Sequence, residues 1–318
     1  MKPKVLITKK FPEAVLTPLR EVAEVIDYDG GDYSLMPLVN IFENLPELAA
    51  IINQGELQVL PSMLDLGSHL KVIANVAIGF ENLNPTLLSS RGIWGTNTPG
   101  HFSKPVAEYV IAGVLSLLHK IPQSSAFLVK GLWNNFEPGR WDGASAETKI
   151  FGILGMGAIG SLVADKARAM GFTVIYYGRS HPNQNYRHVP IEELIRSSDV
   201  FSIHIPFSKE NHHFINGEIL QQLKPGVIFV NTSRGKVVDE KELIAQITSG
   251  RIGGALLDVF EHEPEVPEEL INLDNVILTP HIAGGTHEAR INCYKIAIDN
   301  VMEVLKGNKP PNAINSLV

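Results

Sequence analysis

The stretch FGILGMGAIGSLVADKARAMG, residues 151–171, decides the fold. It begins as an apolar strand, passes through three glycines spaced G-x-G-x-x-G, and ends as a helical pattern. Gly155 allows a tight turn, Gly157 lets the backbone approach a pyrophosphate, and Gly160 lets the helix pack closely on the strand. The next strand-like run, FTVIYY at 172–177, completes a βαβ unit typical of dinucleotide binding.

The start of this helix predicts a phosphate site. A helix N-terminus presents free N–H groups and the positive end of its dipole to an anion. A glycine-rich turn that binds nothing is the alternative, but the complete βαβ unit favours binding. We therefore expect cofactor contacts from Gly155, Met156, Gly157, Ala158, Ile159 and Gly160.

The end of the second strand bears on the choice of cofactor. In an NAD site, a carboxylate at this place holds the ribose 2′-hydroxyl. Gly178 stands there instead, and Arg179 and Ser180 add a guanidinium and a hydroxyl that suit a 2′-phosphate. The sequence thus predicts that NADP(H) is preferred and NAD(H) is possible, unless Arg179 is only a solvated turn residue.

Outward from this unit, strand-like and helical runs alternate along nearly the whole chain. Five strands precede residue 98 and six lie between about 100 and 285, which predicts parallel sheets covered on both faces. We expect an α/β protein in which a Rossmann-type doubly wound domain, residues 99–285, is inserted into a second, flavodoxin-like α/β domain, residues 1–98 plus 286–318. Residues 102–121 read as one helix, and 119–149 as an arm that could reach another subunit.

Composition restricts the class of protein. The chain has 318 residues, 44 % hydrophobic and 19 % charged, as in ordinary globular proteins. Its net charge of −7 argues against nucleic acid or an anionic membrane as the main partner. Cys293 is the single cysteine, so no internal disulfide can form and the cytoplasm is expected. The longest apolar run, 110–118, is too short to span a membrane.

Three residues with catalytic chemistry each follow a predicted strand: Arg234, Glu263 and His281. Ligands of open α/β sheets bind at the carboxyl ends of the strands, so these side chains should gather at one edge. Arginine can bind a carboxylate and polarise a carbonyl, histidine can supply the proton after hydride transfer, and glutamate can orient the histidine and raise its pKa. Singly, each has a structural alternative: a sheet-edge ion pair, a surface acid or a structural histidine.

A second group of histidines gives no indication of a metal site. His212 and His213 fall in a turn, and their spacing with His204 matches no familiar metal site. We therefore expect no metal.

The sequence resembles the D-isomer-specific 2-hydroxyacid dehydrogenase family in its glyoxylate/hydroxypyruvate reductase-like branch. The matching stretches keep their order over most of the chain: VAIGFENLN, GIWGTNTPG, VAEYVIAGVLSLL, GILGMGAIG, HIPFSKENHHFIN, LKPGVIFVNTSRGKVVDEKEL, GGALLDVFEHEP and LTPHIAGGT. The resemblance implies catalytic roles for Arg234, Glu263 and His281. It also implies a homodimer, hinge closure over the substrate, and an arm that can send Trp141 into the partner's site.

The resemblance also implies binding residues. Backbone N–H groups at Ile78 and Gly79 would hold the substrate carboxylate, beside Arg234 and His281. Asp258 would lie near the nicotinamide amide. Further cofactor contacts are expected from Ser103, Ile205, Pro206, Thr232 and Ser233.

The chain departs from the family pattern at three places. Gly178 replaces the usual acidic residue, which supports NADP(H). Lys104 stands where many members have aspartate, and Glu81 where aspartate is commoner.

These observations predict an NADP(H)-dependent reductase that converts small 2-oxo acids to D-2-hydroxy acids, with histidine as general acid. Glyoxylate, hydroxypyruvate, sugar-derived and bulkier 2-oxo acids share the recognised carboxylate and carbonyl, so the substrate stays open. Two alternatives remain: a dinucleotide-sensing protein such as a corepressor on the same fold, and an NAD-linked hydroxy acid dehydrogenase.

Overall fold

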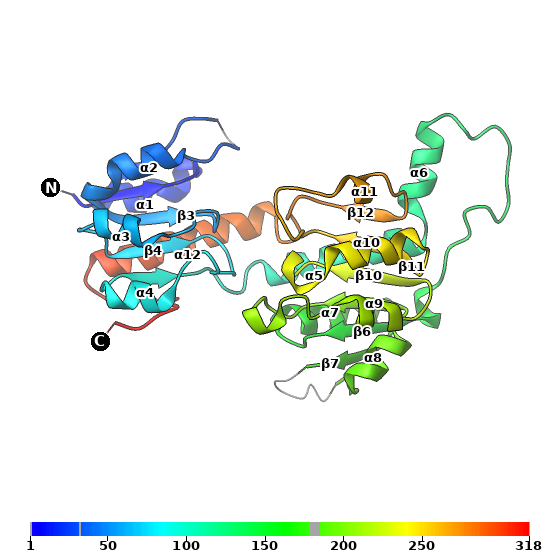
Figure 1. The fold of residues 1–318 in the computed structure, drawn as a ribbon. Helices are drawn as coiled ribbons and strands as arrows, with labels where there is room; N and C mark the ends of the chain where they lie inside the picture. The colour runs from blue at the N-terminus through cyan, green and yellow to red at the C-terminus, as the bar shows by residue number, and fades with distance from the viewer. Residues whose placement is uncertain (1, 32, 179–184, 318) are drawn as a thin grey trace. The chain divides into compact units, whose positions relative to one another are not determined.

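Parallel strands and covering helices alternate in the computed structural model, which describes residues 2–31, 33–178 and 185–317 (Figure 1). The chain forms two compact units, residues 1–102 with 286–318, and residues 103–285. The sequence-based boundaries were residues 98 and 285. Each unit is described by itself below.

The first unit is built on a five-stranded parallel sheet in the order β2-β1-β3-β4-β5, the flavodoxin-like order. Its strands are β1 (Lys4–Ile7), β2 (Glu24–Ile26), β3 (Leu48–Asn53), β4 (Val72–Asn75) and β5 (Trp94–Thr96). Its helices are α1 (Glu13–Val22), α2 (Leu38–Asn44), η1 (Leu45–Glu47), α3 (Pro61–Leu66), α4 (Pro85–Ser90) and α12 (His287–Leu305). The last segment returns to the sheet, where Ala313 bridges Thr96.

The second unit is built on a parallel sheet in the order β12-β11-β10-β9-β6-β7-β8. Its strands are β6 (Ile150–Leu154), β7 (Thr173–Tyr177), β8 (Arg187–His188), β9 (Val200–Ile203), β10 (Val227–Asn231), β11 (Ile252–Leu257) and β12 (Val276–Leu278). Its helices are α5 (Ser103–Leu118), α6 (Ile121–Val129), η2 (Ala146–Thr148), α7 (Ala158–Ala169), α8 (Ile191–Ser197), η3 (Lys209–Asn211), α9 (Gly217–Gln222), η4 (Gly235–Val237), α10 (Glu240–Thr248) and α11 (Glu268–Ile271). Counted from β6, this is the doubly wound dinucleotide order with one strand added at its edge.

The long helix expected over 102–121 is shorter in the structure. It ends at Leu118, and a separate helix, α6, begins at Ile121. Lys120 between them has a φ of 51°, a left-handed conformation that interrupts helical hydrogen bonding. Pro122 then lies in the first turn of α6, where its missing N–H costs nothing.

One strand was not anticipated. β8 has only two residues and pairs in parallel with β7. A strand this short has no room for the alternating or β-branched pattern by which strands are recognised in a sequence.

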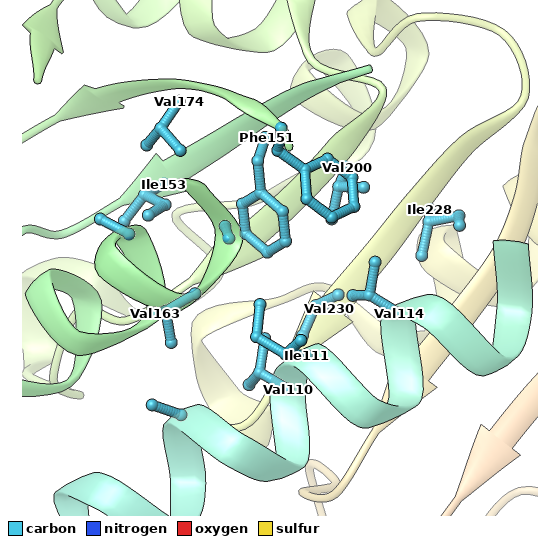
Figure 2. Close-up of a cluster of buried hydrophobic side chains, with 14 of the residues drawn as sticks. Val110, Ile111, Val114, Phe151, Ile153, Val163, Val174, Val200, Ile228 and Val230 are labelled. Atoms are coloured by element: carbon cyan, nitrogen blue, oxygen red, sulfur yellow. The ribbon is translucent and has the colours of Figure 1, made fainter. Parts of the chain in front are cut away.

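One hydrophobic core of the second unit lies between its sheet and α5 and α7 (Figure 2), and another involves α8, α9 and α10. Val110 and Val114 of α5 are fully buried against strand residues such as Phe151 and Val230. Burying a side chain of this size contributes roughly 1.5–3 kcal/mol, so this layer fixes the two helices on one face of the sheet. Among the described residues, no helix combines the length and apolar character that crossing a bilayer would require.

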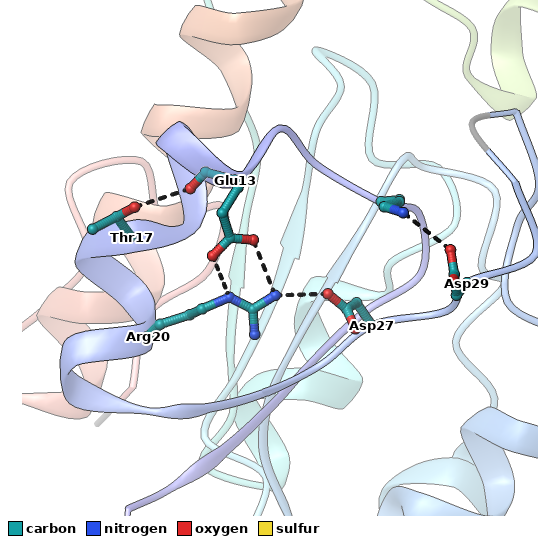
Figure 3. Close-up of polar contacts among 6 residues, drawn as sticks. Glu13, Thr17, Arg20, Asp27 and Asp29 are labelled. Carbon is teal, nitrogen blue, oxygen red and sulfur yellow. Dashed lines mark hydrogen bonds and ion pairs between the residues drawn. The ribbon is translucent and has the colours of Figure 1, made fainter.

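The surface of the first unit carries a small charged network around Arg20 (Figure 3). Arg20 Nε donates to Glu13 on the same helix at 2.8 Å, and its Nη2 donates to Asp27, just past β2, also at 2.8 Å. These groups are partly exposed, so each contact adds about 1 kcal/mol at most. The network ties α1 to the end of β2, the edge strand of this sheet.

Candidate functional site

The carboxyl ends of the second unit's strands form one edge that carries nearly all the predicted site residues. Because the sheet is parallel, the segments after neighbouring strands lie beside one another. Arg234, Glu263 and His281 follow β10, β11 and β12, three adjacent strands. The glycine turn follows β6, and β6 and β9 are where the strand order reverses, the usual ligand position in such sheets.

His281 and Glu263 form a hydrogen-bonded pair. His281 Nδ1 lies 2.9 Å from Glu263 Oε2, and Glu263 Oε1 accepts the backbone N–H of Phe260 at 3.0 Å. Both carboxylate oxygens are therefore engaged, which orients the imidazole. Among the residues that the structure describes, His281 Nε2 has no hydrogen-bond partner, so this nitrogen can serve a substrate.

The pair shifts the pKa of both groups. The hydrogen bond to Glu263 raises the pKa of His281 more than burial lowers it, and the charges of Glu263 and Asp258 add to the rise while that of Arg234 opposes it. Burial would raise the pKa of Glu263, but the contact with His281, the Phe260 N–H and the Arg234 charge together lower it. The arrangement therefore favours an ionised glutamate beside a protonated histidine.

Arg234 joins the same site. Its charge acts on both Glu263 and His281, and its Nη1 donates to the carbonyl oxygen of Ser233 at 2.7 Å. The backbone that carries it is held by Asn231, whose Nδ2 donates to the Arg234 carbonyl at 3.0 Å. Asn231 is buried at the end of β10, and its supporting role was not anticipated from the sequence.

Asp258 has a structural role that the sequence reasoning missed. It is 1 % exposed, and its carboxylate accepts the Thr279 hydroxyl at 2.6 Å and the backbone N–H groups of Ile282 and Ala283 at 2.7 and 2.8 Å. These three contacts hold the turn that carries His281. The expected place beside the nicotinamide amide stays a prediction.

The turn itself has an unusual backbone. His281 has a φ of 54°, a left-handed conformation that non-glycine residues seldom adopt. Its N–H lies within hydrogen-bond distance of the carbonyls of Asp258, at 2.9 Å, and Thr279, at 3.0 Å. Strain of this kind persists where surrounding contacts impose it, and it is concentrated at functional sites.

The glycine turn fits a pyrophosphate. Gly155 has a φ of 101°, and a Cβ on it would lie 2.8 Å from the backbone of His204. A Cβ on Gly160 would lie 2.0 Å from the Gly155 carbonyl oxygen, so close helix packing requires glycine there. Gly157, the N-cap of α7, has no heavy atom within 4 Å of its would-be Cβ. The open space thus lies where a phosphate would approach the helix N-terminus.

The structure also describes most of the other predicted cofactor residues. Ile205 and Pro206 follow β9, and Thr232 and Ser233 follow β10, all at the same edge. Ser103 begins α5 and is buried. Met156, Ala158 and Ile159 lie in the glycine turn and the first turn of α7.

The buried hydroxyl of Thr232 bears on ligand binding. The Thr232 hydroxyl is buried and has no hydrogen-bond partner among the described residues. A buried hydroxyl without a partner is costly, so a bound ligand that reaches it would supply the missing contact.

The cofactor-selecting turn is only partly described. Gly178 follows β7, and a Cβ there would lie 3.4 Å from the Met156 nitrogen, an ordinary contact. Space therefore does not demand glycine at this position. Arg179 and Ser180 lie outside the described residues.

His204, next to the glycine turn, is a poor proton donor. Burial lowers its pKa to about 4, and its Nε2 lies 2.8 Å from the Ser202 hydroxyl. A histidine with this pKa is neutral near pH 7, so it leaves acid catalysis to His281.

The predicted carboxylate-binding loop lies in the first unit, after β4. The Asn97 amide donates to the Ile78 carbonyl at 2.7 Å, and the Asn75 amide donates to the Gly79 carbonyl at 3.2 Å. Within the described part of the chain, the N–H groups of Ile78 and Gly79 have no hydrogen-bond partner. Buried Asn82 braces Asn75 in turn, so side chains hold this loop by its carbonyls and leave its donors available.

Comparison with known proteins identifies the family of the chain. A family model described as D-isomer specific 2-hydroxyacid dehydrogenase, NAD binding domain, matches residues 111–283. Glyoxylate reductase from Thermococcus litoralis is 36% identical over 325 residues, covering 99% of this chain and 97% of that protein.

Solved structures show the same likeness. The TT0316 protein of Thermus thermophilus superposes with a TM-score of 0.92 at 32% identity, covering 98% of this chain and 99% of the other. An NADPH-dependent glyoxylate/hydroxypyruvate reductase from Sinorhizobium meliloti, in complex with NADP and malonate, has a TM-score of 0.84 at 26% identity, covering 99% and 97%. The chain thus belongs to the D-isomer-specific 2-hydroxyacid dehydrogenase family, in its glyoxylate reductase branch, and is an NAD(P)-dependent oxidoreductase.

Proposed function

We propose that the protein reduces small 2-oxo acids, glyoxylate above all, to D-2-hydroxy acids with NADPH as the hydride donor. The observation that carries this proposal is the His281–Glu263 pair, with its 2.9 Å contact and its raised histidine pKa. A protein that only sensed a dinucleotide would have no use for a proton donor at this place. The glyoxylate reductase relatives support the same substrate class.

The site residues divide the reaction among them. Arg234 binds the substrate carboxylate and polarises the carbonyl oxygen. The N–H groups of Ile78 and Gly79, in the first unit, stay the predicted carboxylate donors of the family resemblance. The nicotinamide ring, when bound, supplies a hydride to the carbonyl carbon. His281 then gives its proton to the carbonyl oxygen, while Glu263 stabilises the imidazolium before transfer and keeps the ring in place afterwards.

The preference for NADPH rests on Gly178. A carboxylate at this position would repel a 2′-phosphate, and glycine removes that repulsion. The solved relative from Sinorhizobium meliloti is described as NADPH-dependent and was captured with NADP. Arg179 and Ser180 would complete the phosphate contacts in this proposal.

Assembly and location complete the proposal. We place the enzyme in the cytoplasm as a homodimer, for which its single buried Cys293 and the exposed apolar residues of its arm give support. Trp141 packs against Phe127 within the arm, with ring centroids 5.3 Å apart, and its reach into a partner's site is part of the same proposal.

A steady-state assay with glyoxylate and either NADPH or NADH tests the function. We expect turnover with both cofactors, a lower KM for NADPH, and a loss of roughly 10²- to 10⁴-fold in kcat for His281→Ala. His69→Ala, an exposed histidine of the first unit, serves as the matched control. NADPH that binds without any oxidation at any pH would instead show a cofactor sensor.

Gly178→Asp tests the cofactor assignment. The new Cβ meets only ordinary contacts, so the fold should tolerate the change. The carboxylate should weaken NADPH binding at least tenfold and strengthen NADH binding, as measured by quenching of protein fluorescence. Equal effects on both cofactors would refute the preference.

A further inference from the structure

A turn with two histidines meets the loop after β11 at a cluster of three metal-ligating side chains. His212, His213 and Glu261 each place one ligand atom within 4.8 Å of the other two. His213 Nε2 lies 2.7 Å from Glu261 Oε1, and the rings of His212 and His213 stack with centroids 4.0 Å apart. We propose that these three side chains bind a divalent first-row transition ion, with Zn²⁺ the best match.

The ligand types suit this ion. Two neutral imidazoles and one carboxylate form a common zinc ligand set, which leaves a fourth position for water. At bond lengths of about 2.0–2.1 Å, tetrahedral ligand atoms lie about 3.4 Å apart, so the His213–Glu261 contact would open slightly. His212, an exposed residue, would approach by rotating its side chain out of the stack with His213.

An acidic group stands behind one of the ligands. His213 Nδ1, the nitrogen that faces away from Glu261, lies 4.0 Å from Asp239 Oδ2. A carboxylate behind a metal-bound histidine fixes its tautomer and raises its basicity. Asp239 is itself fixed, because its Oδ1 caps α10 by accepting the Glu242 N–H at 3.1 Å. The negative charge of Asp239 therefore stands near one of the ligand histidines, at a distance longer than a hydrogen bond.

The backbone of two ligands is also held in place. His213 has a φ of 50°, and its N–H donates to the Lys236 carbonyl at 3.0 Å. The Glu261 N–H donates to Glu240 Oε1 at 3.2 Å. A histidine kept in a left-handed conformation directs its ring toward a residue 48 positions further along the chain.

The expectation of no metal considered only histidines close together in the sequence. His204, the third of them, is bound to Ser202 and takes no part in this cluster. Glu261 supplies the ligand that spacing alone could not reveal.

Isothermal titration of the full-length, chelator-treated protein with Zn²⁺ tests the site. We expect one ion per chain, with affinity reduced at least tenfold in His212→Gln and in Glu261→Gln. His212 is exposed, so its replacement leaves the fold intact. Asp239→Asn keeps a capping side chain but loses the charge behind His213, and should weaken binding about tenfold. His69→Gln, outside the cluster, should bind as the parent does.

Co²⁺ provides an independent readout of coordination. Bound at a tetrahedral nitrogen–oxygen site, it should give intense visible absorption bands that disappear on adding Zn²⁺ and are absent in His212→Gln. The proposal is overturned if the parent binds no Zn²⁺, or if binding and the Co²⁺ bands survive unchanged in both ligand variants. In either case the cluster is only a histidine–glutamate hydrogen bond beside a stacked ring.

Discussion

The hydrogen bond between His281 and Glu263 controls the proton that the reaction needs. Reduction requires His281 to be protonated, and the glutamate contact raises its pKa, so the proton stays bound to a higher pH than on a free imidazole. The pair also stabilises the fold in a defined range. The contribution of His281 is complete below about pH 6.5 and is lost as pH rises through its folded pKa. The contribution of Glu263 to stability is lost as pH falls through its lowered pKa.

Replacing Glu263 by Gln should move the pH profile of reduction. In the parent, kcat/KM for glyoxylate falls as pH rises through the raised pKa of His281. Without the carboxylate that pKa drops, so the fall should begin at lower pH, costing about tenfold in rate on the alkaline side for each unit of displacement. Profiles of the two proteins measured with saturating NADPH decide the matter. Superimposable alkaline limbs would contradict the role given to Glu263.

The pH dependence of stability that we expect from His204 is opposite in sign to that from His281. Its folded pKa of about 4 lies below its unfolded value of about 6.5, so the unfolded chain takes up a proton first as pH falls. The free energy of unfolding should therefore drop by on the order of 3 kcal/mol between pH 7 and pH 4 because of this residue alone. In His204→Gln that part of the drop should disappear in urea unfolding experiments. An identical pH dependence in both proteins would show that His204 is not buried in its neutral form.

At the scale of the element, we expect two glycines of the strand–turn–helix unit to have different roles: Gly160 is needed for packing and Gly157 for cofactor binding. A Cβ on Gly160 meets a backbone oxygen that cannot give way, so Gly160→Ala should cost about 3 kcal/mol in the free energy of unfolding. A Cβ on Gly157 meets nothing, so Gly157→Ala should cost less than about 1 kcal/mol but weaken NADPH binding at least tenfold. Urea unfolding and fluorescence titration separate the two effects. The assignment fails if Gly157→Ala binds NADPH like the parent.

The elements also show how far the sequence could predict the fold and the site. The alternation of strands and helices predicted both sheets, because a buried parallel strand carries its signal in its own apolar residues. The end of α5 at Leu118 was missed, since the left-handed Lys120 has no signature in residue type. Asp258 escaped notice as a support because its partners come from the fold: its carboxylate meets a turn more than twenty residues away. The side chain of Asn231 bonds Ser233 and Arg234, nearby in the chain, a local contact that the residue type alone does not specify. The sequence could place Arg234, Glu263 and His281 at the ends of strands. It could not give the distances and hydrogen bonds between them.

At the scale of the whole molecule, the arm is the feature that the single chain leaves unexplained. α6 and the loop that follows it stand away from the sheet of the second unit (Figure 1). Large apolar side chains are exposed along this stretch, among them Leu128, Val129, Leu132, Trp133 and Phe136. Phe136 is 86% exposed, an arrangement that costs solubility unless another surface covers it.

We therefore expect a dimer whose interface includes the arm. Sedimentation velocity of the parent should give a mass near twice 34.9 kDa. Trp133→Asp combined with Phe136→Asp should shift the protein to monomers, because two charges would be buried unpaired at the interface. Leu38→Asp with Val39→Asp, at similarly exposed apolar positions of the first unit, should leave the dimer intact. A monomeric parent, or an arm variant that still sediments as a dimer, would mean that the arm's apolar side chains face solvent for another reason.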